Sequence, residues 1–405
     1  MAVGVAAAQN FFSVDGIRLS AVAANIRYKE RPDLVLIEIA AGSVVSGVFT
    51  QNAFCAAPVI VARNHLAQSS SQFFLINTGN ANAGTGETGE TDALRCCNAV
   101  ADLAGNESWQ VLPFSTGVIG EKLPVERIIN SLPNAFQKLT DSNWGLAAQG
   151  ILTTDTRPKL SSAQVSIDDQ VVTITGLAKG AGMIKPNMAT MLSYVFTDAC
   201  IDQKSLDGFL REAVNLSFNR LTVDGDTSTN DCCMLTATGL SGVMISDIED
   251  DACQKFKEAL LGVFLELATN LIKDAEGATK FVTVEVNQGK DEQECLQVAY
   301  CIAESPLVKT ALFASDPNWG RILAAVGRAG LEDLDIDSVK IYLGETQIVA
   351  AGARAPGYRE ELGQLEMNQE EIAIRIDLAR GSHSERVWTS DLSHDYVRIN
   401  AEYRT

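Results

Sequence analysis

The residue with the clearest potential for chemistry in this sequence is Thr190. It follows a loop of small and turn-forming residues, Lys179 to Ala189, and precedes an apolar run that begins at Met191. Glycine, proline and asparagine in this order predict a tight loop that delivers one hydroxyl group to the mouth of a buried strand. On composition alone, such a loop is more often a plain turn than a reactive centre.

A threonine hydroxyl is a poor nucleophile at neutral pH and needs a base beside it. The chain has three histidines, His65, His383 and His394, and none lies near a glycine-rich cluster. An N-terminal amine, with a pKa of about 7.7–8.0, can serve as the base instead. Thr190 gains such an amine only if its hydroxyl attacks the Ala189 carbonyl and water then releases the resulting ester. Among the histidines, His394 is the rival base to test.

The string KGAGMIKPNMATML, residues 179–192, closely resembles the self-cleaving centre of the ornithine acetyltransferase (ArgJ) family. The resemblance covers essentially the whole chain, from Asp15 to Thr405. It implies cleavage between Ala189 and Thr190 into an α chain, 1–189, and a β chain, 190–405, which together form one catalytic unit. It also implies an α+β fold, a layered sandwich of the ArgJ and DmpA type, and assembly as an α2β2 heterotetramer.

The activity implied by this resemblance is transfer of an acetyl group from N2-acetylornithine to glutamate in arginine biosynthesis, through an acetylated Thr190. The exchange needs no cofactor. Bifunctional members of the family also accept acetyl-CoA as a co-substrate, and the sequence leaves open whether this chain does. Two alternatives also stay open: an amidase or aminopeptidase that uses the same threonine with water as the acceptor, and a non-enzymatic binding protein with glycine-rich loops.

The other site residues are assigned from the same resemblance. The segment around Thr116 and Gly117 matches the oxyanion hole of the family, where a hydroxyl and a backbone N–H would hold the negative oxygen of the tetrahedral intermediate. The substrate-binding residues of the family match Thr153, Lys179, Thr190, Glu276, Asn400 and Thr405. A lysine at this position could take a substrate carboxylate or polarise the site. A glutamate suits the side-chain ammonium of ornithine.

Taken without the resemblance, these positions would be ordinary. The cluster around Thr153 would be a cap or a turn, Glu276 a solvated carboxylate at a helix end, and residues 400–405 a frayed terminus.

Two further polar strings are shared with the family and are expected near the active centre. Residues 77–86 lack the lysine and hydroxyl order of a P-loop, so we expect them to form adjoining turns. Residues 222–231 are similar to part of an EF-hand, but Leu235 stands where the bidentate glutamate is required. We therefore predict a structured loop without calcium, and no metal site elsewhere.

The composition indicates a globular protein, with 46% apolar and 20% charged residues among 405. The net charge of −19 argues against nucleic acid or an anionic membrane as a partner. Residues 1–10 lack the basic start of a signal peptide, and the apolar run at 260–272 is too short to cross a bilayer. We therefore expect a soluble, cytoplasmic protein, and the resemblance implies small-molecule substrates.

The nine cysteines include the vicinal pairs Cys96-Cys97 and Cys232-Cys233, and we expect buried free thiols. Apolar periodicity predicts strands over 34–40, 73–76, 171–175, 282–286, 339–343 and 371–378, and helices over 91–104, 206–216, 256–271 and 322–326. Gly277 is expected to stop the third of these helices. An antiparallel edge or hairpin arrangement suits the last two strands.

Overall fold

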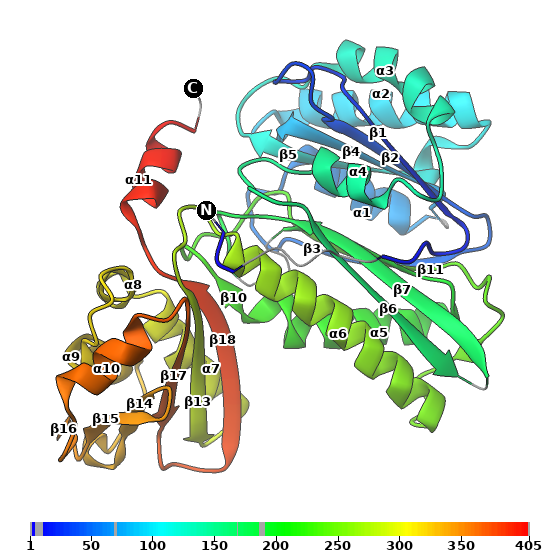
Figure 1. Ribbon diagram of the computed structural model, residues 1–405. Coiled ribbons are helices and arrows are strands. Elements are labelled where there is room, and N and C mark those ends of the chain that lie inside the picture. The colour runs from blue at the N-terminus through cyan, green and yellow to red at the C-terminus, as the bar shows by residue number, and fades with distance from the viewer. Residues whose placement is uncertain (1, 5–10, 69–70, 168, 186–190, 404–405) are drawn as a thin grey trace.

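The computed structural model describes residues 2–4, 11–68, 71–167, 169–185 and 191–403. Three large sheets and one two-stranded sheet organise this part of the chain. The first two pack face to face, and the third forms a separate unit with its own core (Figure 1).

The first sheet has the strand order β1-β2-β4-β5, in which only β4 and β5 pair in parallel. Its strands are β1 (Ile17–Val22), β2 (Leu34–Ile39), β4 (Phe73–Asn80) and β5 (Val111–Val118). Two amphipathic helices, α2 (Gly86–Ala104) and α3 (Val125–Gln137), bury their apolar stripes on one face of this sheet.

The second sheet has the order β3-β11-β8-β7-β6. Its strands are β3 (Val44–Phe49), β6 (Lys159–Ile167), β7 (Gln170–Lys179), β8 (Leu192–Thr197) and β11 (Cys232–Ala237). The helices α5 (Gln203–Leu216) and α6 (Asp251–Lys273) cover its outer face. A short pair, β9 (Cys200–Ile201) and β12 (Met244–Ile245), lies at its margin.

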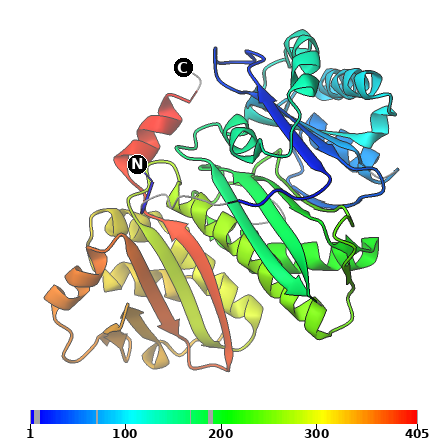
Figure 2. The same ribbon diagram turned by 45° about the vertical axis from the view of Figure 1, so that its right-hand side comes forward.

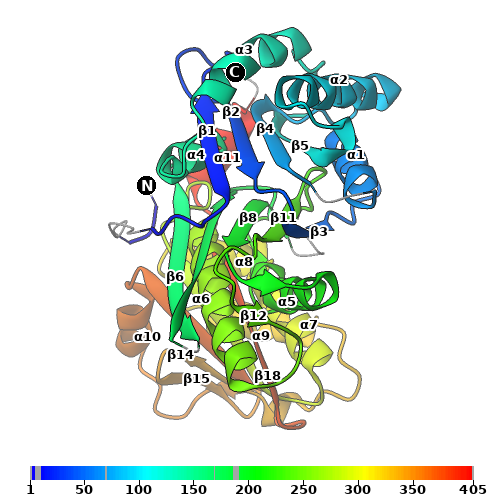
Figure 3. The same ribbon diagram turned by 90° about the vertical axis from the view of Figure 1, so that its right-hand side faces the viewer.

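Aromatic side chains join the two sheets. Phe74 and Phe114 of the first sheet pack on Tyr194 of the second, with ring centroids 5.8 and 5.2 Å from the tyrosine ring. Two helices, α1 (Ala57–Leu66) and α4 (Trp144–Gly150), contribute to the same core. The successive layers are helices, the first sheet, the second sheet and helices again, as Figure 3 shows. This arrangement confirms the predicted α+β layered sandwich.

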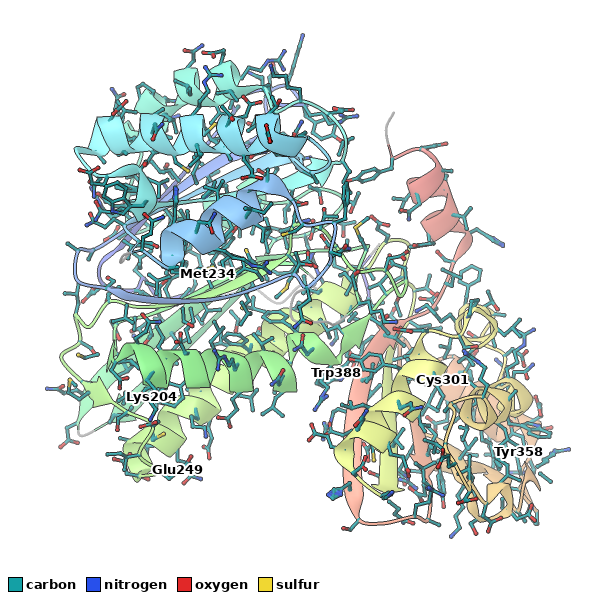
Figure 4. The ribbon with its side chains drawn as sticks, turned by 180° about the vertical axis from the view of Figure 1, so that it is seen from behind. Lys204, Met234, Glu249, Cys301, Tyr358 and Trp388 are labelled. Carbon is teal, nitrogen blue, oxygen red and sulfur yellow. The ribbon has the colours of Figure 1, made fainter. Side chains whose placement is uncertain are left out.

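The third sheet has the order β10-β18-β13-β17-β14-β15-β16. Its strands are β10 (Leu221–Thr222), β13 (Phe281–Gly289), β14 (Lys340–Leu343), β15 (Thr346–Ala350), β16 (Ala353–Arg354), β17 (Glu371–Asp377) and β18 (His383–Ser390). Its helices are α7 (Glu292–Ala303), α8 (Pro306–Phe313), α9 (Trp319–Gly327) and α10 (Glu360–Met367). Trp388 of β18 belongs to the core that includes α6, and Figure 4 shows it where the two units meet.

The last helix, α11 (His394–Ala401), leaves the third sheet and extends away from it, as Figures 1 and 2 show. Ser393 caps its first turn, and its hydroxyl also donates a hydrogen bond of 2.6 Å to the Gly277 carbonyl. No residue of α11 within the described chain is buried. The hydrogen bonds of Ser393 therefore help to hold this helix, which buries no apolar face in this part of the chain.

Three sequence predictions need correction. Residues 77–80 complete β4 instead of forming turns, because they extend the ladder to β5. Helix α6 ends at Lys273, and Gly277 takes a left-handed φ of 68° in the turn after it. Strand β17 pairs antiparallel with β14 as predicted, but it is not an edge strand because β13 pairs on its other side.

The predicted boundary at residues 189 and 190 falls between β7 and β8, which are neighbours in one sheet. Both of these residues lie outside the part of the chain that the structure describes. Strands β3, β6 and β7 come from residues 1–189, whereas β8 and β11 come from 190–405. The two predicted chains therefore share the second sheet and are not separate domains.

The four vicinal cysteines are buried and all nine cysteines are free thiols, as predicted. Within the described ranges, no helix has the length and apolar character needed to cross a membrane.

A buried lysine in the third unit allows a prediction about stability. Lys309 of α8 donates hydrogen bonds to the Thr389 hydroxyl, at 2.8 Å, and to the Ser390 carbonyl. Burial lowers its pKa to about 8, against a partial opposing effect of Asp391. Between pH 8 and 10.5 the unfolded chain therefore binds more protons at this lysine than the folded chain does, and its contribution to stability rises with pH.

We expect the free energy of unfolding of the wild type, relative to Lys309→Met, to rise by up to roughly 3 kcal/mol between pH 7 and 10.5. Urea denaturation of both proteins across this window is the measurement. The comparison is necessary because buried cysteines, whose pKa values are raised, act in the opposite direction. A difference that stays constant with pH would contradict the assignment.

Candidate functional site

A cavity of about 270 Å³ lies where the end of β5, the end of β7 and the start of β8 meet. Its walls come from segments that are far apart in the sequence. They are the β5 end (Thr116, Gly117, Val118, Ile119), the 153–154 turn, the β7 end and following loop (Lys179, Gly180, Ala181, Gly182, Met183), Met191 and Leu192, the 228–231 loop, Ala81, Glu276, Asn400 and Tyr403.

The proposed oxyanion donors, Thr116 and Gly117, lie on one wall of this cavity. Strand β5 pairs in parallel with β4 at this point, and Gly117 lies opposite Gly79. Gly117 has a φ of 133°, and a Cβ atom there would collide with the backbone of Gly79 and Asn80. Only glycine allows the two strands to approach this closely at the cavity wall.

Gly117→Ala should destabilise the fold by roughly 2–6 kcal/mol, the sum of backbone strain and overpacking. The control is Gly262→Ala, since Gly262 is an exposed residue of α6 with open space around it. That substitution should be neutral, or stabilising by up to about 1 kcal/mol. Thermal and urea unfolding measure both, and equal stability of the two variants would contradict the close approach.

Lys179, at the end of β7, donates a hydrogen bond of 2.9 Å to the Thr116 hydroxyl oxygen. Because the ammonium group is the donor, the Thr116 proton remains available to point into the cavity. Burial lowers the pKa of Lys179, while the carboxyl groups of Asp155 and Asp231 oppose that shift. Of the two roles considered for this lysine, the geometry favours polarising Thr116.

Glu276 is 8% exposed and lies in the turn after α6. Its backbone N–H donates to the Ala181 carbonyl at 2.9 Å, and its carboxylate accepts a hydrogen bond of 2.7 Å from the Asn400 side chain. A Cβ atom at Gly182 would lie 2.5 Å from this carboxylate, so a larger residue there would displace the Glu276 side chain. Helix α11 thus brings Asn400 to the same cavity as Thr116 and Gly117.

The structure places Thr116, Gly117, Thr153, Lys179, Glu276 and Asn400 around one cavity, as the resemblance implies. Ala189, Thr190 and Thr405 lie outside the described residues. Met191, which follows Thr190 in the chain, lines the cavity, and its carbonyl accepts a hydrogen bond of 2.9 Å from the Cys232 N–H.

None of the three histidines, all of which are in the described part of the chain, lines the cavity. His65 is buried and contacts the Val111 carbonyl through Nδ1 at 2.8 Å. The rival base, His394, is exposed and packs edge-on against Phe313, with ring centroids 5.4 Å apart. The geometry therefore gives no support to His394 as a base at this site.

Sequence reasoning assigned no role to several cavity residues. Asp231 is buried, and desolvation raises its pKa well above the usual range although Lys179 opposes this. Asn230 donates hydrogen bonds to the carbonyls of Ala81, at 2.6 Å, and Ser115, at 2.9 Å, and so fastens the 228–231 loop to β5. The polar string at 222–231 predicted this loop, but no local sequence pattern indicates which of its residues face the cavity.

The chain is similar to a known family, to proteins of other organisms and to a solved structure. The family model described as "ArgJ family" matches residues 18–405. The "Arginine biosynthesis bifunctional protein ArgJ" of Pseudomonas fluorescens is 54% identical over 406 residues, and that of Psychrobacter arcticus is 55% identical over 407; each alignment covers 100% of both chains. A crystal structure of the protein with the same description from Bacillus halodurans is 39% identical, with a TM-score of 0.50, and covers 52% of this chain and 99% of its own.

Proposed function

Because this chain belongs to the ArgJ family, whose members named above are enzymes of arginine biosynthesis, we propose that it is the acetyltransferase that moves an acetyl group from N2-acetylornithine to glutamate. The single observation that carries the proposal is the shared cavity. The residues on both sides of the loop that contains Thr190 line it together with Thr116, Gly117 and Glu276.

In the proposed first half-reaction, the Thr190 hydroxyl attacks the acetyl carbonyl and its own amine takes the proton. The Thr116 hydroxyl and the Gly117 N–H hold the negative oxygen, and Lys179 supports Thr116 through its hydrogen bond. The amide C–N bond breaks, the amine returns the proton to the leaving nitrogen, and ornithine departs. Glutamate then attacks the acetyl ester, and N-acetylglutamate leaves.

The charges of the cavity suit these substrates. The Glu276 carboxylate, with Asn400 beside it, offers a partner for the side-chain ammonium of ornithine. The exchange requires no cofactor. Since the relatives are named bifunctional, release of CoA from acetyl-CoA in the presence of glutamate is the assay for a second acetyl donor.

We also propose that the chain cuts itself between Ala189 and Thr190, and that two α and two β chains assemble in the cytoplasm as an α2β2 heterotetramer. In support, the crystallised Bacillus halodurans chain matches over 99% of its length while spanning 52% of this one. A polypeptide of about half length is what a cut precursor would yield.

Intact mass spectrometry and an exchange assay test the proposal together. Purified protein should show two polypeptides, residues 1–189 and 190–405, and should transfer labelled acetyl from N2-acetylornithine to glutamate. Native mass spectrometry should show two copies of each. Hydrolysis of acetylornithine at the same rate without glutamate would instead identify an amidase, and binding without any turnover would identify a non-enzymatic protein.

A further inference from the structure

A buried cluster of three charged side chains lies behind the cavity wall. The Lys159 ammonium is 2.5 Å from an oxygen of Asp155 and 2.5 Å from an oxygen of Asp274. The lysine side chain is 1% exposed and both carboxylates are 0% exposed. Replacing such a buried network by apolar side chains is often neutral for stability, so a contribution to folding alone does not account for it.

Asp155 connects this cluster to two parts of the cavity. One of its oxygens accepts the Gly180 N–H at 2.7 Å, and the other accepts the Thr153 N–H at 3.0 Å. Gly180 directly follows Lys179. The Asp155 carboxylate therefore fixes the backbone at or next to two of the expected substrate-binding residues, Thr153 and Lys179. Burial alone would raise the pKa of Asp155, but the ammonium groups of Lys159 and Lys179 hold it well below its usual range.

Asp274 makes the corresponding connection on the opposite side. It follows the last residue of α6 and accepts backbone N–H groups of Thr156, at 3.0 Å, and Arg157, at 3.3 Å. Two residues further along, the Glu276 N–H donates to the Ala181 carbonyl at 2.9 Å.

These contacts close into a ring. From Asp155 it passes through the Gly180–Ala181 backbone to Glu276, then back along the chain to Asp274, and through the Lys159 ammonium to Asp155. A shift of any member would move the cavity wall, because none of the links is a flexible exposed side chain.

We propose that Asp155 is a positioning residue of this enzyme: through the ring it sets the relative placement of Thr153, Lys179 and Glu276 around the substrate. This inference rests on the proposed function. It predicts that loss of the Asp155 charge impairs catalysis beyond any loss of stability. It also predicts a change at Lys179, because the Asp155 carboxylate opposes the effect of burial on the lysine pKa.

The experiment compares Asp155→Asn with the wild type in acetyl exchange from N2-acetylornithine to glutamate. Asparagine keeps the size but removes the charge, so kcat/KM should fall by about 10- to 100-fold, as expected for a displaced binding group. The alkaline limb of the kcat/KM profile should move to lower pH, since Lys179 then loses its proton more easily.

Asp198→Asn is the matched control. Asp198 is also a buried aspartate, and it accepts a hydrogen bond of 2.9 Å from the Thr173 N–H. It follows the last residue of β8, whereas the cavity lies at the first residue of that strand, and it does not line the cavity. It should lower the thermal unfolding temperature without changing kcat/KM or its pH profile. Asp155→Asn with the kcat/KM and pH profile of the wild type would overturn the inference.

The two possible failures are distinguishable. If the wild type shows no exchange, the proposed function fails; if the wild type exchanges and Asp155→Asn matches it, only the positioning role fails. Should Asp155→Asn not fold, Thr156→Val provides a second test, because it removes only the hydrogen bond that the hydroxyl of the exposed Thr156 donates to Asp274, a member of the ring. We expect kcat/KM to fall by about three- to tenfold in that variant. An unchanged value would overturn the inference equally.

Discussion

Thr190→Ala is expected to accumulate as one uncut polypeptide and to lose acetyl exchange by roughly 10⁶-fold, the loss typical of removing a nucleophile. Alanine has no hydroxyl to attack the Ala189 carbonyl, so the backbone stays intact. The same substitution removes the group that would carry the acetyl. Intact mass spectrometry reads the first effect and the exchange assay reads the second.

Thr190→Ser separates the hydroxyl from the rest of the side chain. Serine keeps a nucleophilic oxygen, so this variant should still yield two polypeptides and measurable exchange. Uncut Thr190→Ala that exchanged acetyl at the wild-type rate would show that neither the new amine nor this hydroxyl is required, and the proposed mechanism would be wrong.

The second large effect is expected at Thr116. Thr116→Val keeps the shape of the side chain but removes the hydroxyl that we assign to the oxyanion. The loss of one such donor should lower kcat by about 10²- to 10³-fold, with little change in KM because the interaction forms in the transition state. Steady-state kinetics at saturating glutamate measure this separation.

The control for Thr116 is Thr236→Val in the neighbouring sheet. Thr236 is a buried threonine of β11 whose hydroxyl has no hydrogen-bond partner among the described residues. Valine should therefore be neutral or stabilising there, and kcat should stay at the wild-type value. A loss of equal size in both variants would mean that the Thr116 effect reflects packing rather than charge stabilisation.

Much of the fold could be predicted from local patterns. The stripe of Phe256, Leu260, Phe264, Leu267 and Leu271 predicted the helix α6, because its period is that of a helix with one buried face. The alternation at 282–286 likewise predicted β13, although the strand extends beyond it. Such patterns depend only on neighbours in the sequence. They therefore predict that a helix or strand is present better than they predict the residues at which it begins and ends.

The site could not be predicted from local patterns in the same way. The hydrogen bond between Lys179 and Thr116 joins residues 63 positions apart, and periodicity does not indicate which strand ends meet. The family resemblance supplied that pairing. The resemblance did not indicate a role for Asp155. In the sequence, an aspartate with a lysine four positions later suggests an ion pair on the surface, whereas the structure buries both side chains behind the cavity wall.

The position of β8 constrains the order of folding and of the proposed cleavage. The strand is hydrogen-bonded between β7 and β11, so its ladder forms only when segments from both sides of residue 190 have already met. If the chain is cut at residue 190 as proposed, the cut must therefore come after folding, and two separately made fragments would have to assemble the second sheet between them. We therefore expect denaturant to separate the two proposed chains readily, and refolding of the separated chains to restore their complex poorly.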